Sequence, residues 1–168
     1  MYEKIDLLQE TEDYYFIDYI PYKINNPKFL ELEEYFLKEY LPLFAEKVAR
    51  IVLKVMYYYP CKAYLTQPTK MTPKGIEITY DADIRHYLPD KFVEIIKQVI
   101  MTDFSSLQIL FSAPQFLISV CGEFSVTIYG VSKEPEVINI LQQLVSQEGL
   151  YLKQNEIGQA NITESTEE

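Results

Sequence analysis

The sequence has no tryptophan, one histidine and five scattered glycines among its 168 residues. A single histidine, His86, leaves few ways to pair a nucleophile with a base. The glycines, at positions 75, 122, 130, 149 and 158, do not form the clustered loops that bind nucleotide phosphates. No nucleophile, base and stabilising group occur together, so we expect a protein that is not an enzyme, with no catalytic residue, no metal ligand and no cofactor.

Basic residues are also scarce: 15 Lys and Arg face 25 Asp and Glu, for a formal net charge of −10. This excess of negative charge opposes binding to nucleic acid and to anionic membranes, since both reward Lys and Arg. No apolar run approaches the roughly 20 residues that a membrane-spanning helix needs. We therefore expect no nucleic-acid or membrane partner, and we expect any protein partner to be basic.

The two cysteines, Cys61 and Cys121, fall in predicted strands, where they are typical of small buried apolar residues in a reducing compartment. Residues 1–10 are acidic and lack the basic start and the apolar run of a signal peptide. These features together predict a cytoplasmic protein.

The composition, 48% hydrophobic and 24% charged, is typical of a folded chain. A chain of this length fits one domain, which we expect to span residues 1–154. Residues 155–168 hold four glutamates, no basic residue and little apolar content, which predicts a flexible acidic tail.

The longest periodic stretch, residues 26–60, predicts helix. Asn26 followed by Pro27 is the favoured order at a helix start, and Pro42 predicts a kink or break because it lacks an amide hydrogen. Apolar residues recur at steps of three and four, which keeps them on one side of the helix. They are Phe29, Leu32, Phe36, Tyr40, Leu43, Phe44, Val48, Ile51, Val52, Val55 and Tyr59.

Period-two alternation predicts strands before and after this helix. Residues 14–20 predict a short strand that Pro21 either places at a sheet edge or ends. Segments 61–66 and 75–80 each alternate, and the loop between them holds two prolines and leads into Gly75, so they predict a hairpin.

The strongest strand signal, residues 106–129, predicts a three-stranded meander. Residues 112–114 predict its first turn, and Gly122 with Glu123 predicts a tight two-residue hairpin at its second. A helix that begins at Pro89 precedes the meander, and its apolar stripe is Phe92, Ile95, Ile96, Val99 and Ile100. After it, Ser132 is the expected N-cap of a last helix that Gly149 stops, and residues 150–153 are expected to return as a short strand.

This succession of elements predicts an α+β fold: an antiparallel sheet of about five or six strands, with helices packed mainly on one face. The order after position 89 permits several topologies, and the sequence does not select one.

An acidic, tyrosine-rich cluster near the N-terminus is the best candidate for a partner-binding site. Charge complementarity speeds encounter with a basic protein, and aromatic anchors supply affinity. The alternative is an edge strand whose alternate rings belong to the core. The cluster consists of Glu12, Asp13, Tyr14, Tyr15, Asp18 and Tyr19.

The segment Asp81–His86 is a second candidate, because Asp81, Asp83 and His86 could ligate a metal through mixed oxygen and nitrogen donors. Its spacing matches no zinc or calcium loop, however. A polar loop before a helix is the competing interpretation.

Parts of the chain resemble a group of small uncharacterised bacterial cytoplasmic α+β proteins. The resemblance is carried by residues 15–21, 29–37, 52–54 and 57–59, which are mostly core and cap positions. The ending Glu148–Leu152, after an amphipathic helix, is similar to the close of small α+β immunity proteins that guard bacteria against toxins. Size and acidity are similar as well, and no functional residue is implied by either resemblance.

The sequence thus leads to three hypotheses. The first is a non-enzymatic protein-binding module, most concretely an immunity or antitoxin-type inhibitor of a basic toxin. The second is a small-molecule- or metal-binding domain with a site near Asp81–His86. The third is a self-associating structural protein. The oligomeric state is left open.

Overall fold

A six-stranded antiparallel sheet forms the centre of the computed structural model, which describes residues 1–155. The strands follow the order β2-β3-β4-β5-β1-β6, and every neighbouring pair is antiparallel. Their bounds are β1 Tyr14–Asp18, β2 Cys61–Leu65, β3 Leu107–Ser112, β4 Gln115–Val120, β5 Val126–Tyr129 and β6 Tyr151–Gln154.

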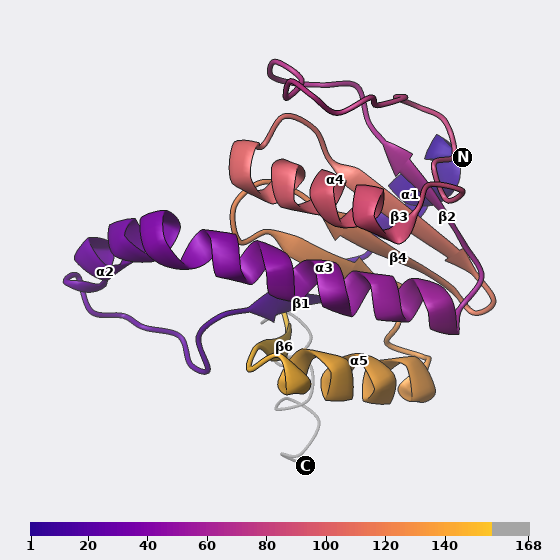
Figure 1. Ribbon diagram of the computed structural model, residues 1–168. Coiled ribbons are helices and arrows are strands. Elements are labelled where there is room, and N and C mark those ends of the chain that lie inside the picture. The colour runs from indigo at the N-terminus through magenta and orange to yellow at the C-terminus, as the bar shows by residue number, and fades with distance from the viewer. Residues whose placement is uncertain (156–168) are drawn as a thin grey trace, which may run out of the picture.

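Most of the helices cover one face of this sheet, which we call the inner face (Figure 1). The first helix instead packs on the opposite, outer face, where its Ile5 lies in a small cluster with Tyr64 and Leu117. The expected α+β fold, with helices mainly on one face, is therefore confirmed. The helices are α1 Tyr2–Gln9, α2 Phe29–Tyr35, the π-helical segment η1 Phe36–Tyr40, α3 Leu41–Tyr58, α4 Pro89–Thr102 and α5 Pro135–Gln147.

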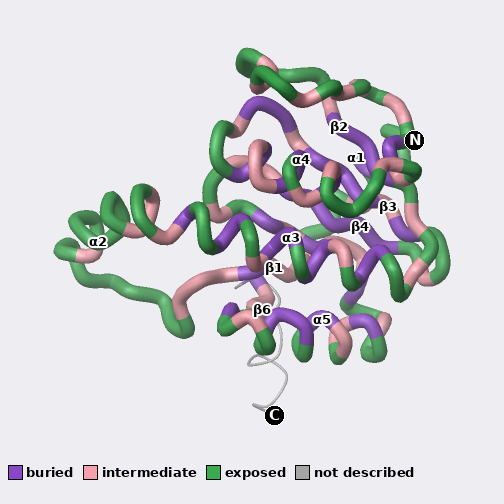
Figure 2. The backbone as a smooth tube through the Cα atoms, viewed as in Figure 1, coloured by how far each residue is buried: buried purple, intermediate pink, exposed green. Residues whose placement is uncertain are grey.

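Helix α3 supplies the largest apolar surface to the core. Phe44, Val48, Val52 and Val55 are fully buried, and they pack with α4 and the inner face of the sheet (Figure 2). Each such side chain stabilises the fold by about 1.5–3 kcal/mol when it leaves water. The apolar stripe predicted for α4 is confirmed too, and it is buried along its length: Phe92, Ile95, Ile96, Val99 and Ile100.

The helical stretch is interrupted as Pro42 suggested. Segment η1 separates α2 from α3, and Pro42 lies in the first turn of α3, where a missing amide hydrogen costs nothing. Helix α2 buries no residue and projects from the body as an arm (Figures 1 and 2). The predicted apolar stripe is thus not buried along its whole length: Leu32 in the arm is 50% exposed, and Leu43 in the first turn of α3 is 44% exposed.

Strand β1 is not an edge strand. It lies between β5 and β6, and the chain leaves the sheet at Asp18, before Pro21. The expected return of the chain after the last helix is confirmed as β6, which forms one edge of the sheet. Thus the first and last parts of the described chain pair with each other.

The predicted hairpin between residues 61–66 and 75–80 is wrong. The first segment is β2, but its partner is β3, and residues 75–80 form no strand. The alternating side chains of that segment, Ile76, Ile78 and Tyr80, pack against the core from an irregular loop. Apolar alternation therefore reflected burial here and not strand pairing.

The three-stranded meander β3-β4-β5 is confirmed, but its second turn is longer than predicted. Residues 121–125 connect β4 to β5, and Cys121 N–H donates to the Ser125 carbonyl at 2.9 Å. Glu123, not Gly122, has the positive φ, +60°. Gly122 is needed for a different reason: a Cβ there would lie 2.2 Å from Asp103 Oδ1.

Three boundaries differ from expectation or lie beyond the described part. Helix α5 begins at Pro135, three residues after the predicted cap Ser132, although it ends as expected before Gly149, whose φ is +70°. Helix α1 was not predicted. Of the predicted tail 155–168, only Asn155 is described, and the rest lies outside the described residues.

None of the helices in residues 1–155 is long and apolar enough to cross a membrane.

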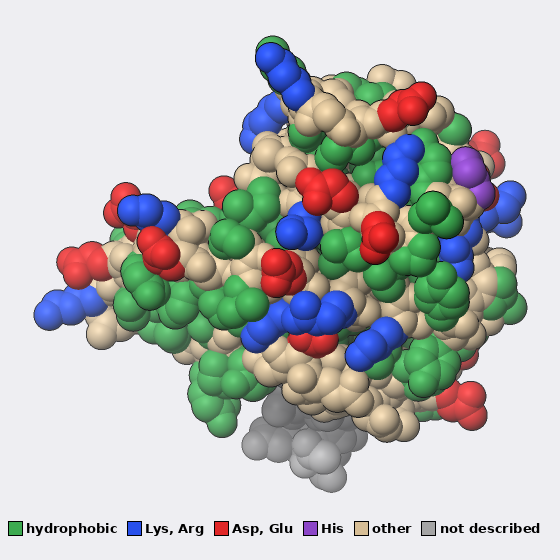
Figure 3. Space-filling model, in the orientation of Figure 1, with side chains coloured by type: hydrophobic (Ala, Val, Ile, Leu, Met, Phe, Trp, Pro, Cys, Tyr) green, Lys and Arg blue, Asp and Glu red, His purple; other side chains and the backbone are tan. Residues whose placement is uncertain are grey.

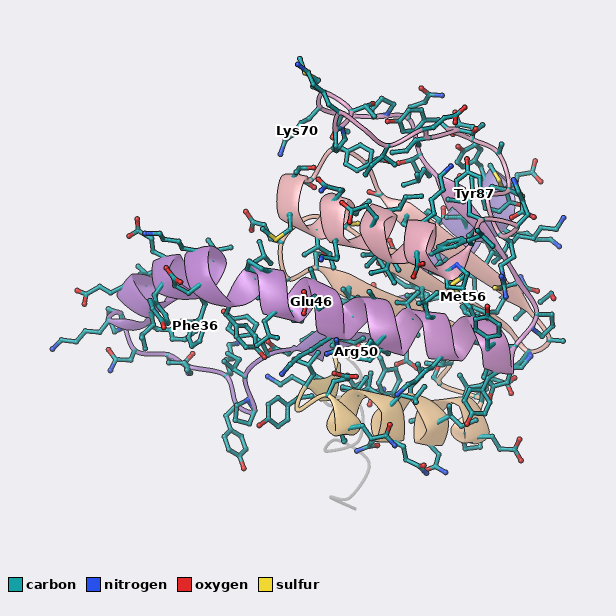
Figure 4. The ribbon with its side chains drawn as sticks, in the orientation of Figure 1. Phe36, Glu46, Arg50, Met56, Lys70 and Tyr87 are labelled. Atoms are coloured by element: carbon teal, nitrogen blue, oxygen red, sulfur yellow. The ribbon has the colours of Figure 1, made fainter. Side chains whose placement is uncertain are left out.

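One ion pair joins α3 to the end of α5, and Figure 4 shows Arg50 on the side of α3 that faces α5. Arg50 donates from Nε and Nη2 to the two carboxylate oxygens of Glu148, at 2.9 and 2.8 Å. These hydrogen bonds lower the pKa of Glu148 below its ordinary value of 4.5.

Replacing Glu148 with Gln should lower the free energy of unfolding by about 0.5–1 kcal/mol at neutral pH, the range of a surface ion pair. Because the folded-state pKa is the lower one, this contribution is present above pH 4.5 and is lost as the pH falls through the folded-state pKa. Urea unfolding at neutral and acidic pH measures it. Glu46→Gln is the control, since the Glu46 carboxylate pairs with Lys97 at 3.6 Å and acts on Arg50 only through a weaker Coulomb attraction. An equal loss in both variants would contradict the prediction.

Candidate functional site

The candidate site is the outer face of β1, where the sheet extends beyond α1. Tyr14, Phe16 and Asp18 alternate along this face, whereas Ile17 is buried in the core beneath the helices. The register places Tyr14 opposite Tyr129 of β5, with ring centroids 5.7 Å apart. Helix α1 reaches as far as Tyr129, so β1 and β6 lie past its cover.

The six predicted site residues are therefore divided between two faces. Tyr14 and Asp18 lie on the outer face, and Glu12 and Asp13 precede the strand. Tyr15 and Tyr19 pack against the core instead. The pKa of the Tyr15 hydroxyl is raised, mainly because the ring is partly buried and also because the negative charge of Asp13 is near. The alternative interpretation is therefore right that Tyr15 and Tyr19 belong to the core, although β1 is not an edge strand. Whether the rest of the cluster binds a partner stays a prediction.

Two of the predicted acids hold β6 in place. Asp18 Oδ2 accepts a hydrogen bond from Lys153 Nζ at 2.8 Å, and its Oδ1 accepts one from the Tyr19 amide at 2.7 Å. Asp13 Oδ1 accepts one from Gln154 Nε2 at 2.8 Å. Asp18 and Lys153 are only 19% and 22% exposed, so this pair is partly desolvated and fixes the edge strand to β1.

Two open grooves flank the outer face of β1 and share Tyr14 and Phe16. The first, the β6-side groove, has a volume of about 940 Å³ and the second, the β5-side groove, about 470 Å³. The β6-side groove is lined by Tyr14, Phe16, Asp18, residues 20–24, Phe29 and residues 152–155. The β5-side groove is lined by Tyr14, Phe16, Tyr19, Glu33 and residues 122–127.

An aromatic cluster fixes the arm beside the β5-side groove. The ring of Tyr19 lies 4.1 Å from that of Phe124 and 5.2 Å from that of Phe36, centroid to centroid. Phe36 belongs to η1, at the root of the arm (Figure 4). Burial chiefly raises the pKa of the Tyr19 hydroxyl, with further contributions from Asp18 and Glu33, so Glu33 of the arm lies near this ring. The arm thereby brings a carboxylate to a groove of the sheet.

Negative charge is concentrated at the start of the chain. Residues 1–18 hold six acids and one lysine, whereas between residues 19 and 155 the 15 acids and 14 bases nearly balance. On the helix-covered face, acidic and basic side chains are interspersed (Figure 3). Asn155 donates to the carbonyl oxygens of Tyr14 and Glu12. The point where the sequence continues into its last four glutamates therefore adjoins the acidic N-terminal segment.

The segment Asp81–His86 has a structural role. Asp83 Oδ1 accepts hydrogen bonds from the amides of Ala63, at 3.1 Å, and Arg85, at 3.0 Å. Asp81 accepts a hydrogen bond from Gln67, and His86 stacks edge-on against Tyr87. Within residues 1–155, no three His, Cys, Asp or Glu side chains gather in a way that could hold a metal ion.

The cysteines are free and only partly buried, unlike the buried positions predicted for them. Burial raises the pKa of the Cys61 thiol, which leaves it protonated and weakly nucleophilic. Cys121 belongs to a row of hydrogen-bonded polar groups, which also includes Ser106, Ser119 and Gln108. Within residues 1–155, no acidic or basic side chain is hydrogen-bonded to these groups, so they offer no activated nucleophile.

Among the lining residues that sequence reasoning missed are the aromatic and acidic ones Phe16, Glu33, Glu123 and Phe124. Phe16 was recoverable, because strand alternation places it beside Tyr14 and Asp18. The other three come from the arm and from the β4–β5 turn, and only the tertiary fold brings them to β1.

Comparisons with protein-family models, with curated proteins and with solved structures found no match.

Replacing Asp83 with Ala should lower the free energy of unfolding by about 1–2 kcal/mol, because the buried Ala63 amide loses its acceptor. Thermal and urea unfolding measure this loss. Glu77→Ala, an exposed acid of the same loop, should change stability little. Adding a divalent metal should shift neither protein's melting temperature; a metal-dependent shift that Asp83→Ala abolishes would contradict this structural role.

Proposed function

We propose that the chain is a non-enzymatic protein-binding module that binds a basic partner protein through the acidic N-terminal segment and the outer face of β1. The observation that carries this proposal is that the segment richest in negative charge, residues 1–18, leads into β1, whose outer face borders two open, aromatic-lined grooves. Elsewhere in residues 19–155 the charges nearly balance.

Electrostatic steering supports this function. Asp6, Glu10 and Glu12 are exposed, and Glu3 adds a fourth acid on the same short segment. A one-signed patch attracts a basic surface from a distance and raises the association rate. Because these side chains are in water, their effect falls as salt is added.

The grooves offer pockets for anchoring side chains, which give an affinity that charge alone does not. Interfaces depend on a few buried anchors, often aromatic or Arg side chains that fill pockets. Tyr14 and Phe16 are half-buried walls of both grooves, so an inserted anchor would bury further aromatic surface. The arm adds exposed apolar side chains near the same face, including Leu30 and Tyr35.

The specific form of the proposal is an immunity or antitoxin-type inhibitor of a basic toxin. Enzymes that act on nucleic acid carry basic surfaces for phosphate, and an acidic protein docked there blocks the substrate. An exposed acidic surface on a rigid sheet is suited to this task.

Neutralising the acidic segment should weaken partner binding by on the order of tenfold at low salt. The test captures the partner from a lysate of the encoding organism, identifies it, and compares its dissociation constant for the wild type and for the triple variant Asp6→Asn, Glu10→Gln, Glu12→Gln. The difference should shrink as salt rises, because these charges are exposed.

The matched control is the triple variant Glu77→Gln, Glu94→Gln, Glu136→Gln, which removes the same charge from exposed positions on the loop, α4 and α5. It should bind nearly as the wild type does. A partner that is not basic, or an affinity indifferent to salt, would overturn the proposal.

A further inference from the structure

The β5-side groove combines aromatic walls with carboxylates at two sides. Phe16, Tyr19 and Phe124 line it, together with Glu33 from α2 and Glu123 from the β4–β5 turn. No Lys or Arg lines it among residues 1–155. The acids come from segments 90 positions apart in the sequence, so the fold, and not a local run of charge, gathers them.

Both acids are held on ordered backbone. The Glu123 amide donates to the Ile100 carbonyl at 2.8 Å, and the neighbouring Gly122 amide donates to Asp103 Oδ1 at 3.2 Å. On the other side, stacking of Tyr19 with Phe36 fixes the root of the arm that carries Glu33. The backbone positions that carry the two carboxylates are therefore set by the fold before any ligand arrives.

Aromatic faces and carboxylates attract the same kind of group. A cation over a ring is stabilised by the negative face of the ring, and carboxylates add direct Coulomb attraction. A guanidinium group suits such a site better than an ammonium group does, since it is planar, stacks on rings and donates several hydrogen bonds in one plane.

We propose that the β5-side groove binds an arginine side chain of the basic partner, stacked on Phe124 or Phe16 and paired with Glu33 and Glu123. This inference rests on the proposed function and names the anchor that the partner contributes. The acidic segment steers the encounter, and the groove holds one cationic side chain in place.

The test is a nuclear magnetic resonance titration of the ¹⁵N-labelled full chain with an acetylated tetra-arginine amide peptide, and with the neutral tetra-citrulline peptide of the same shape. Arginine should shift the amide resonances of residues 122–127 and of Glu33, and citrulline should not. Glu33→Gln with Glu123→Gln should raise the dissociation constant for the groove by at least about fivefold.

The matched control is Glu31→Gln with Glu34→Gln, two exposed acids of the same arm that do not line the groove. It should leave groove binding within about twofold of the wild type. Equal shifts with citrulline, or equal losses in the two double variants, would overturn the arginine site. So would shifts confined to residues 3–12; these would leave the acidic segment as the only basic-partner surface, and the proposed function would stand without this anchor.

Discussion

The packing of α3 on the inner face of the sheet is the interaction on which the other parts depend. Its buried stripe from Phe44 to Met56 contacts the strands and α4, and Arg50 ties it to the end of α5. Because this burial uses one side of the sheet for most of the helices, α1 is the one helix of residues 1–155 that packs on the other side. The open outer face of β1 follows from that division.

The arm and the grooves are two results of the same arrangement. Helix α3 reaches past the sheet through η1, so α2 has no layer to pack on and its apolar side chains remain in water. A seven-residue helix without burial gains little from propensity alone, and Tyr19, Phe36 and Phe124 stabilise its root. Glu33 is thereby positioned by aromatic contacts that lie outside its own helix.

The sequence predicts correctly the helices and strands in which apolar residues recur with one period along the whole element. The stripe of α4 and the alternation of the β3-β4-β5 meander were predicted because local pattern and final burial agree there. It was misleading at residues 75–80, where alternating side chains pack from a loop, and in the arm, where an amphipathic stripe meets no core. The part of the site on β1 could be predicted from the sequence, because its residues follow one another along the chain. Glu33 and Glu123 are far apart in the sequence, and only the fold brings them to the same groove.

The loop after β2 has a consequence for behaviour in concentrated solution. An outermost strand normally presents amide and carbonyl groups that can recruit a strand from another molecule. Here the Ala63 amide is taken by the Asp83 carboxylate, and the carbonyls of Ala63 and Leu65 accept from Ile84 and Asp81. A short stretch of loop thus stands in for a seventh strand along this part of β2, and these backbone groups are not free to serve as a template for fibril growth.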